Sequence, residues 1–81
     1  MVSLVRSPKS LGEALRRARR AAGLTQAELG RRTSLRQATI SSLENGDGAT
    51  LDTLFAVLTA LRLDVELGPR SDSGPALEDL F

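Results

Sequence analysis

The chain has 81 residues, enough for one small domain whose core supplies only about 3–5 kcal/mol of net stability. It contains neither cysteine nor histidine, which excludes disulfides and the usual zinc ligands and leaves association with a second copy as the simplest source of further stability. The net charge of +1 is the balance of two unlike halves: residues 1–44 carry nine basic and three acidic side chains, whereas residues 45–81 carry two and seven. An Arg-rich half favours an anionic partner, because guanidinium groups pair with phosphates.

The first predicted helix covers about residues 8–22. Ser7 suits its N-cap, with Pro8 in the first turn, although Ser10 and Glu13 form a competing capping box. Apolar residues recur at helical spacing at Leu11, Leu15, Ala18 and Ala22, before Gly23 as the expected helix end. The opposite face is basic and carries Arg16, Arg17, Arg19 and Arg20. The residues before this helix, 1–7, are predicted to be an N-terminal extension.

Two short helices are predicted next, at about 26–33 and 36–44. Thr25 and Glu28 form a capping box before the first, and Ser34 occupies the break between the two. The glycine-rich stretch ENGDG ends the second. The fourth predicted helix has Thr50 as its N-cap and an apolar stripe made of Leu51, Leu54, Phe55, Leu58 and Leu61.

After the fourth helix the hydrophobic period changes to two residues. In LRLDVEL, residues 61–67, apolar and charged side chains alternate, which predicts a half-buried strand over about 62–67. A single strand cannot satisfy its own backbone, so it pairs either with the N-terminal VSLV or with its copy in a second subunit. The second pairing is favoured because the domain already needs a partner, and it makes Leu63, Val65 and Leu67 the dimerisation residues. Residues 68–81 have the composition of a disordered tail.

The stretch TQAELGRRTSLRQATISSLENG, residues 25–46, has the spacing of a helix-turn-helix corner. Two helices that meet at about 90–120° across so short a turn leave room for only a tiny side chain at their crossing, which is Gly30. Ser34 takes the tight turn. The shared core is filled by Leu29, Leu35, Ile40 and Leu43. We therefore predict an all-α fold with a four-helix helix-turn-helix domain at 8–62, followed by the short β-strand that pairs across a homodimer.

The outward face of the second corner helix suggests the function. A purely structural corner would present long charged side chains there, but this helix presents short ones that suit close approach to base edges in the major groove. Gln37 can pair with adenine, Ala38 can contact the thymine methyl group, and the serines can bond to either base type. Gln26 and Arg36 lie where side chains meet phosphates. The predicted DNA-binding residues are Gln26, Arg36, Gln37, Ala38, Thr39, Ser41, Ser42 and Asn45.

The same stretch resembles the phage-repressor-like (Cro, XRE) helix-turn-helix domains, and the resemblance extends over about residues 8–62. It implies a lambda-repressor-like fold and a dimer on an inverted-repeat operator in double-stranded DNA, with the second motif helix in the major groove. By position, the resemblance assigns DNA contacts to Gln26, Gln37, Ala38, Ser42 and Asn45. The sequence departs from the family pattern at Gly30, where Ala is common, at Ser34, where Gly is common, and at Arg36, where a Ser or Thr cap is usual.

A narrower resemblance is carried by SPKSL near the N-terminus, by RQATISSLENG, and by LRLDVEL followed by a short tail with an aromatic end. These stretches look like those of HipB-type antitoxins. The resemblance implies a C-terminal strand paired across the dimer. It also implies an autorepressor that belongs to a type II toxin–antitoxin system and neutralises a HipA-type serine/threonine kinase toxin.

Other functions compete with this one. A stand-alone phage-type or metabolic repressor would bind DNA without a toxin, and an interaction module would not bind DNA at all. An enzyme is disfavoured, because without His or Cys only carboxylates, hydroxyls and Arg remain for chemistry, and Glu44 is interpreted as structural. We expect no metal, no cofactor and no membrane partner. The apolar runs are too short to span a bilayer and the N-terminus lacks a secretion signal, which indicates a cytoplasmic protein.

Overall fold

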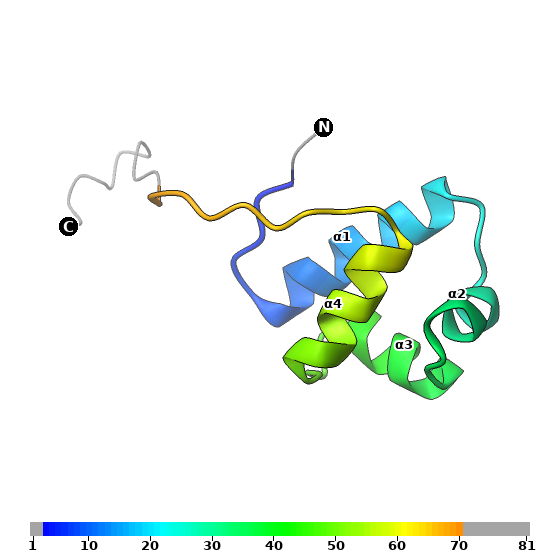
Figure 1. The fold of residues 1–81 in the computed structure, drawn as a ribbon. Coiled ribbons are helices and arrows are strands. Elements are labelled where there is room, and N and C mark those ends of the chain that lie inside the picture. Colours follow the sequence, from blue (N-terminus) through cyan, green and yellow to red (C-terminus); the bar gives the residue numbers. More distant parts are fainter. Residues whose placement is uncertain (1–2, 71–81) are drawn as a thin grey trace.

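The computed structural model of the protein describes residues 3–70. In this range it contains four helices, α1 Pro8–Ala21, α2 Gln26–Thr33, α3 Gln37–Glu44 and α4 Leu51–Ala60, which confirms the predicted all-α helix-turn-helix arrangement (Figure 1). α2 and α3 form the corner, α1 packs against α3, and α4 packs against α2. None of these four helices has both the length and the apolar character needed to cross a bilayer. Most of the predicted tail lies outside the described residues, in 71–81.

The starts of α1 and α2 are fixed by side-chain caps. Ser7 Oγ accepts from the Ser10 N–H at 3.0 Å, and Ser10 Oγ accepts from the Ser7 N–H at 3.1 Å. This confirms Ser7 as the N-cap, whereas the competing box of Ser10 with Glu13 is wrong, because Ser10 lies inside the helix. At α2 the predicted capping box is present: Glu28 Oε1 accepts from the Thr25 N–H at 2.8 Å, and Thr25 Oγ1 accepts from the Glu28 N–H at 3.0 Å.

All four helices end in the same way, with one residue in the left-handed backbone conformation followed by an N–H that bonds back into the helix. The left-handed residues are Gly23 (φ 76°), Ser34 (φ 61°), Gly46 (φ 80°) and Arg62 (φ 60°). Glycine adopts this conformation without strain, but a residue with a Cβ does so at a cost of roughly 1–2 kcal/mol. The predicted tight turn at Ser34 is therefore confirmed, and it is a strained one.

The predicted strand over 62–67 is not formed in the described part of the chain, and the fold prediction is corrected here. Arg62 closes α4 instead of opening a strand, and the N–H of Leu63 bonds back to the Leu58 oxygen at 2.9 Å. In the view of Figure 1 the chain beyond turns back past α1 before it leaves the helices, and it makes no backbone hydrogen bond to residues 3–5. The physical reason is that a strand needs a second strand to satisfy its backbone, and the described residues of one chain supply none.

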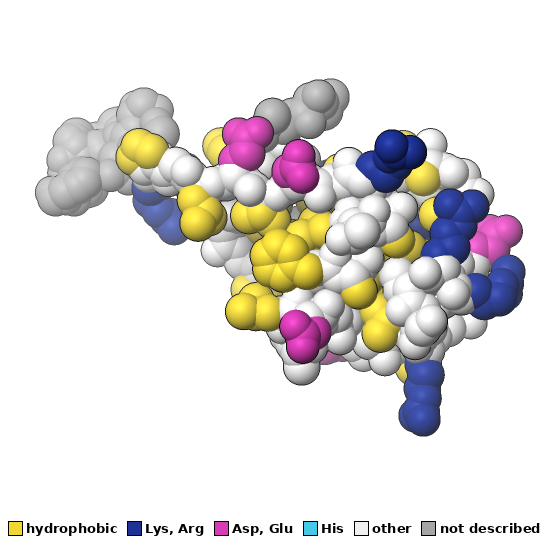
Figure 2. All heavy atoms as spheres, viewed as in Figure 1, with side chains coloured by type: hydrophobic (Ala, Val, Ile, Leu, Met, Phe, Trp, Pro, Cys, Tyr) yellow, Lys and Arg dark blue, Asp and Glu magenta, His cyan; other side chains and the backbone are white. Residues whose placement is uncertain are grey.

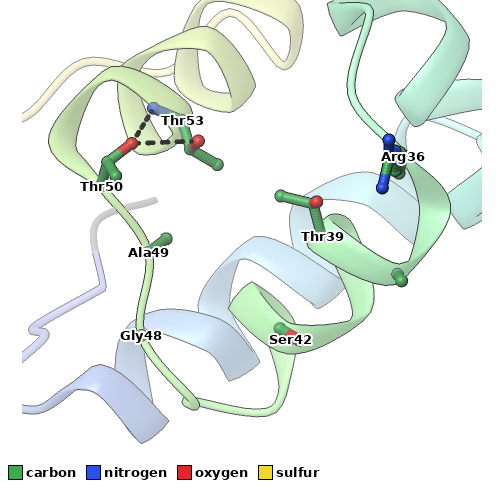
Figure 3. A pocket seen from close by; sticks show the side chains of 8 residues that line it. Arg36, Thr39, Ser42, Gly48, Ala49, Thr50 and Thr53 are labelled. Carbon is green, nitrogen blue, oxygen red and sulfur yellow. Dashed lines mark hydrogen bonds between the residues drawn. The ribbon is translucent and has the colours of Figure 1, made fainter.

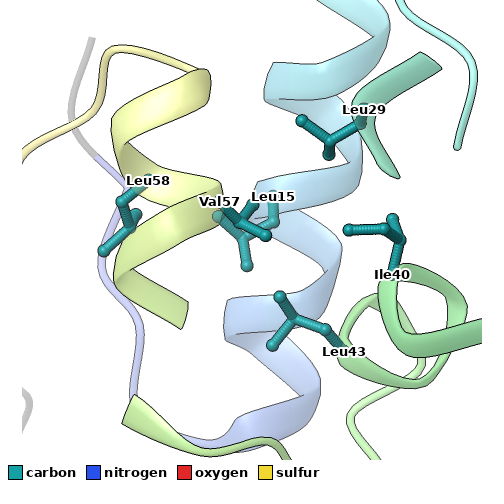
Figure 4. Close-up of a cluster of buried hydrophobic side chains, with 6 residues drawn as sticks. All are labelled: Leu15, Leu29, Ile40, Leu43, Val57 and Leu58. Atoms are coloured by element: carbon teal, nitrogen blue, oxygen red, sulfur yellow. The ribbon is translucent and has the colours of Figure 1, made fainter. Parts of the chain in front are cut away.

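The core is aliphatic and draws on every helix. It consists of Leu15 from α1, Leu29 from α2, Ile40 and Leu43 from α3, and Val57 and Leu58 from α4 (Figure 4). The sequence pattern predicted all of these except Val57. Its stripe on α4 also included Leu51 and Phe55, which are 71% and 52% exposed. Because α4 is apolar around most of its circumference, the pattern did not distinguish the buried edge from the exposed one.

Two glycines allow helices to approach closely. A Cβ on Gly30 would lie 2.7 Å from the Leu35 carbonyl oxygen, so the predicted crossing point is confirmed and has no room for the alanine that is common in the family. A Cβ on Gly12 would lie 2.6 Å from the Leu43 carbonyl oxygen. This second contact, which brings α1 against the end of α3, was not predicted from the sequence.

Replacing Ser34 by glycine should stabilise the domain. We expect Ser34→Gly to raise the free energy of unfolding by about 0.5–1 kcal/mol, because relief of the left-handed strain exceeds the extra chain entropy that glycine loses on folding. The measurement is urea-induced unfolding at constant protein concentration. Ser34→Ala is the control, because it keeps the strained Cβ and should bring no gain. Equal stability of Ser34→Gly and the parent chain would contradict the strain.

Candidate nucleic-acid interface

The outer face of α3 carries most of the predicted DNA-binding residues. Gln37 and Ala38 are exposed, and Asn45 is exposed at the C-cap of the helix. The other members of the face, Thr39, Ser41 and Ser42, are partly exposed. Ile40 and Leu43 lie on the opposite side of the helix and are buried, so the face predicted from the helical period is the one that is open to a partner.

A groove of about 370 Å³ lies between α3 and the segment that leads into α4 (Figure 3). Four predicted residues, Arg36, Ala38, Thr39 and Ser42, line one side, and Gly48, Ala49, Thr50 and Thr53 line the other. The second side of the groove was not predicted from the sequence. The signal that could have found it is the N-cap Thr50, whose Oγ1 accepts from the Thr53 N–H at 3.1 Å and so fixes the start of α4 close to the glycine-rich loop after α3.

The start of α3 has no side-chain cap. Arg36 is the N-cap residue, but its side chain makes no capping hydrogen bond, and its extended backbone shows that the predicted helix start was one residue early. The Arg36 carbonyl accepts from the N–H groups of Thr39 and Ile40. The N–H groups of Gln37 and Ala38 have no hydrogen-bond partner among residues 3–70. An uncapped helix start beside an arginine favours an anion such as a phosphate.

Behind this face lies a buried ion pair that joins α1 to α3. Glu44 is 3% exposed and Arg19 is 7% exposed. Arg19 Nε donates to Glu44 Oε2 at 2.6 Å, and Arg19 Nη2 donates to Glu44 Oε1 at 3.0 Å, which is a two-pronged guanidinium–carboxylate contact. Arg19 also donates from Nη1 to the Leu24 carbonyl oxygen at 2.8 Å. The interpretation of Glu44 as a structural residue agrees with this burial.

Arg19 was predicted to lie on the basic face of the first helix, opposite the apolar face, but it is buried. A signal for its burial was present. Arg19 follows the buried Leu15 by four residues, and Glu44 follows the buried Ile40 by four, so each charged residue shares a helix face with a core residue. Opposite charges at two such positions predict a pair across the helix interface.

Two predicted DNA-binding residues are connected to the same carboxylate, Gln26 directly and Asn45 through Arg16. Gln26, at the start of α2, donates from Nε2 to Glu44 Oε1 at 3.1 Å. Arg16 donates from Nε to Glu44 Oε1 at 3.3 Å and from Nη2 to Asn45 Oδ1 at 2.9 Å. The Glu44 side chain therefore connects α1, the start of α2 and the end of α3 at the edge of the α3 face.

The ion pair also sets the protonation of its members. Burial by itself would raise the pKa of Glu44, but the hydrogen bonds from Arg19, Gln26 and Arg16 and the charge of Arg19 outweigh it, so the pKa lies below its ordinary value of 4.5. The hydrogen bond to Glu44 raises the pKa of the Arg19 guanidinium, although burial opposes it. Both groups are therefore charged at neutral pH.

The basic and apolar parts of the surface are separated. Arg17, Arg20, Arg31 and Arg32 are exposed, and Figure 2 shows basic side chains around α2, with apolar side chains gathered over α4 and the segment that follows it. The exposed members of this apolar face are Leu51, Phe55, Leu63, Val65 and Leu67, with exposed fractions between 37% and 95%. A patch of this kind on a small domain indicates an interaction surface.

Comparison with known proteins finds relatives for this arrangement. Residues 15–67 match the family model described as helix-turn-helix. The antitoxin HipB of Escherichia coli (strain K12) is 39% identical over 70 residues, which cover 85% of this chain and 80% of HipB. Among solved structures, a HipB–O4 20mer complex matches with a TM-score of 0.79 at 37% identity, covering 86% of this chain and 100% of that one. A chain of a HipA–HipB–O2–O3 complex matches with the same values.

Removing the buried carboxylate should destabilise the domain strongly. We expect Glu44→Gln to lower the free energy of unfolding by about 3–5 kcal/mol, because Arg19 stays charged and buried without a counter-ion. The pKa of Glu44 is lower in the folded than in the unfolded chain, so its contribution is complete above about pH 4.5 and is lost as the pH falls below that value. Chemical unfolding at about pH 7 should show Glu44→Gln largely unfolded without denaturant, and the parent chain should lose stability between about pH 7 and pH 3.

Glu28→Gln is the control for this experiment. The pKa of Glu28 is also lowered, by its backbone and side-chain hydrogen bonds with Thr25, so Glu28 contributes to acid sensitivity in the same direction. The substitution leaves the pair of Glu44 with Arg19 intact and should cost far less at neutral pH. Equal costs for Glu28→Gln and Glu44→Gln at neutral pH would contradict the central role given to the buried pair.

Proposed function

This chain belongs to the HipB-type branch of the helix-turn-helix family, and we propose that it is a sequence-specific DNA-binding repressor. It binds as a homodimer to an inverted-repeat operator of its own operon and acts as the antitoxin of a type II toxin–antitoxin pair. The observation that carries this proposal is the outer face of α3, where short polar side chains lie beside an uncapped helix start and Arg36. Long charged side chains would occupy that face if it only had to stay soluble.

In this proposal α3 enters the major groove and reads the bases. Gln37, in the first turn, makes two hydrogen bonds to adenine, and the methyl group of Ala38 contacts a thymine methyl. Ser41 and Ser42 have short hydroxyl side chains that bond to either base type, and Thr39 lies at the edge of the groove shared with the α4 start. The small size of these side chains lets the helix backbone approach the base edges.

Phosphate contacts fix the orientation of α3 in the groove. Arg36 supplies a cation, and the free N–H groups of Gln37 and Ala38 lie beside it. Gln26 lies at the start of α2, and Asn45 at the end of α3, so the two can contact phosphates at either edge of the docked helix. These contacts are independent of sequence and set the register of the protein on the duplex.

An inverted-repeat operator requires two copies related by a twofold axis, and the apolar face over α4 provides a surface for that contact. Leu63, Val65 and Leu67 alternate with charged residues and have no strand partner among the described residues. Pairing of 62–67 with the same segment of a second copy would satisfy these backbone groups. A second copy would also cover exposed apolar side chains of α4, such as Leu51 and Phe55.

The proposed toxin partner is a HipA-type serine/threonine kinase. Support comes from the relative that is assembled with HipA in the HipA–HipB–O2–O3 complex. The alternative is a stand-alone repressor that needs no second protein surface. Co-purification of the tagged chain with the product of the neighbouring gene separates the two, because a stand-alone repressor would be isolated without it.

Specific DNA binding is the first test of the proposal. At about 0.15 M salt the full chain should bind the duplex upstream of its own gene at least about 10³-fold more tightly than a scrambled duplex of equal length. The measurement is a titration followed by fluorescence anisotropy. Equal affinity for the two duplexes would refute an autorepressor and would favour a scaffold or interaction module.

Two variants should distinguish base reading by Gln37 from phosphate contact by Arg36. Gln37→Ala should cost about 1–3 kcal/mol of binding to the upstream duplex and little on the scrambled one, because it removes a sequence-dependent pair of hydrogen bonds. Arg36→Ala should weaken binding to both duplexes and make it less dependent on salt, because it removes a sequence-independent charge contact. The same loss on both duplexes for Gln37→Ala would exclude the base-reading role.

Dimerisation should depend on the apolar positions of the last segment. Val65→Asp should yield a monomer at micromolar concentration, because it buries a carboxylate in the paired face. Val65 is 52% exposed in the single chain, so the substitution leaves the helical domain folded. Asp64→Ala, one residue earlier on the charged side, should remain dimeric. Analytical ultracentrifugation distinguishes these outcomes, and an intact Val65→Asp dimer would contradict pairing through this segment.

A further inference from the structure

We propose that Arg16, on α1, contacts a phosphate of the DNA backbone, and that Glu44 is the positioning residue that holds it in place together with Asn45. The inference rests on the proposed function and deepens it. It adds α1 to an interface that the sequence assigned only to α2, α3 and the residue between them. The ligand it predicts is a phosphate diester of double-stranded DNA, contacted without regard to base sequence.

Arg16 is held in a fixed orientation, but not all of its N–H donors are engaged by residues 3–70. Its Nε donates to Glu44 Oε1 and its Nη2 donates to Asn45 Oδ1, at 3.3 and 2.9 Å. A guanidinium group has more N–H donors than these two bonds use, and the remainder has no partner among residues 3–70. The side chain is 34% exposed, so these donors can reach a group that arrives from solvent.

The positive charge of Arg16 is also available, because Glu44 is already committed to Arg19. The contacts of Arg19 with the carboxylate, at 2.6 and 3.0 Å, are shorter than the 3.3 Å contact of Arg16. Two guanidinium groups share one carboxylate, so Arg16, Arg19 and Glu44 together carry one net positive charge. Arg19 is 7% exposed and cannot present that charge, so it is presented by Arg16.

The neighbours of Arg16 offer donors as well. The amide oxygen of Asn45 accepts from Arg16, which leaves the amide nitrogen of Asn45 for another acceptor. The amide nitrogen of Gln26 uses one hydrogen on Glu44 and keeps a second. Hydrogen-bond donors from three helices therefore surround the guanidinium group, and an oxygen-rich anion is the ligand that matches such a set.

A DNA phosphate is favoured over an acidic side chain of a partner protein because of where the set lies. Gln26 is the first residue of α2, and Asn45 is the C-cap of α3. These are the two helices of the corner that the proposed function docks on DNA. Base reading is excluded for Arg16, since its side chain comes from α1 and is held at the edge of the α3 face by Glu44.

The test is the salt dependence of DNA binding by the full chain. Affinities for the upstream duplex and for a scrambled duplex are measured between about 0.05 and 0.2 M salt. Arg16→Gln should lower the slope of log affinity against log salt by about 0.9 for each subunit, or about 1.8 for the dimer, on both duplexes. The affinity at about 0.15 M salt should fall roughly tenfold or more.

Two variants separate a phosphate contact from a merely structural role. Arg17→Gln removes the same charge one residue along α1, from an exposed side chain outside the cluster, and should leave the slope unchanged. Arg16→Lys keeps the charge but loses the two-pronged geometry and should recover most of the slope, because counter-ion release follows charge. Cooperative unfolding of each variant, followed by circular dichroism, establishes that the fold is retained.

An unchanged slope for Arg16→Gln in a folded protein that still prefers the upstream duplex overturns the inference and leaves the proposed function standing. Equal slope losses for Arg16→Gln and Arg17→Gln overturn it as well, because the effect is then one of overall charge. A slope that Arg16→Lys does not recover points to a structural role and overturns it. If the parent chain shows no preference for the upstream duplex, the repressor proposal fails, whereas the slopes on the scrambled duplex still decide whether Arg16 contacts phosphate.

Discussion

The rest of the molecule depends on the contact between the Glu44 carboxylate and the Arg19 guanidinium. This pair joins α1 to α3, and through Gln26 it also holds the start of α2. Removing two charges from water offsets much of their mutual attraction, so the pair is better understood as fixing how the helices sit together than as a large source of stability. Every buried polar side-chain atom among the described residues has a hydrogen-bond partner, which is the condition under which such a network is tolerated in a small core.

The ion pair and the aliphatic core hold the helices together on the buried side of the corner. The exposed side can therefore carry residues that do not favour a stable helix. α3 begins without a side-chain cap and carries short polar residues of modest helix propensity. The turn before it holds Ser34 in a left-handed conformation. Local rules are broken at this corner and obeyed at the caps of α1 and α2, a distribution that is typical of a functional site supported by a rigid scaffold.

The helix-turn-helix corner and the apolar face over α4 are separate surfaces of the molecule. The exposed side chains of Arg31, Arg32 and Arg36 and the α3 groove lie on the corner. The exposed apolar residues lie over α4 and the segment after it. Such a separation suits a protein whose DNA contacts are repeated by symmetry, since the surface that joins two copies must leave both reading helices open.

The amino-acid sequence by itself determined the four helices, the caps at Ser7 and Thr25, the corner with Gly30 and Ser34, and the outward face of α3. These features depend on residues within a few positions of one another, so helical periodicity and capping chemistry suffice to predict them. Only the tertiary structure decided that Arg19 is buried, which edge of α4 faces the core, that Gly48 and its neighbours complete a groove with α3, and that 62–67 has no partner within the described chain. Each of these depends on groups far apart in sequence or in another molecule. A charged or apolar side chain has the same local pattern whether it faces solvent or a partner, and only the approach of that partner decides between the two.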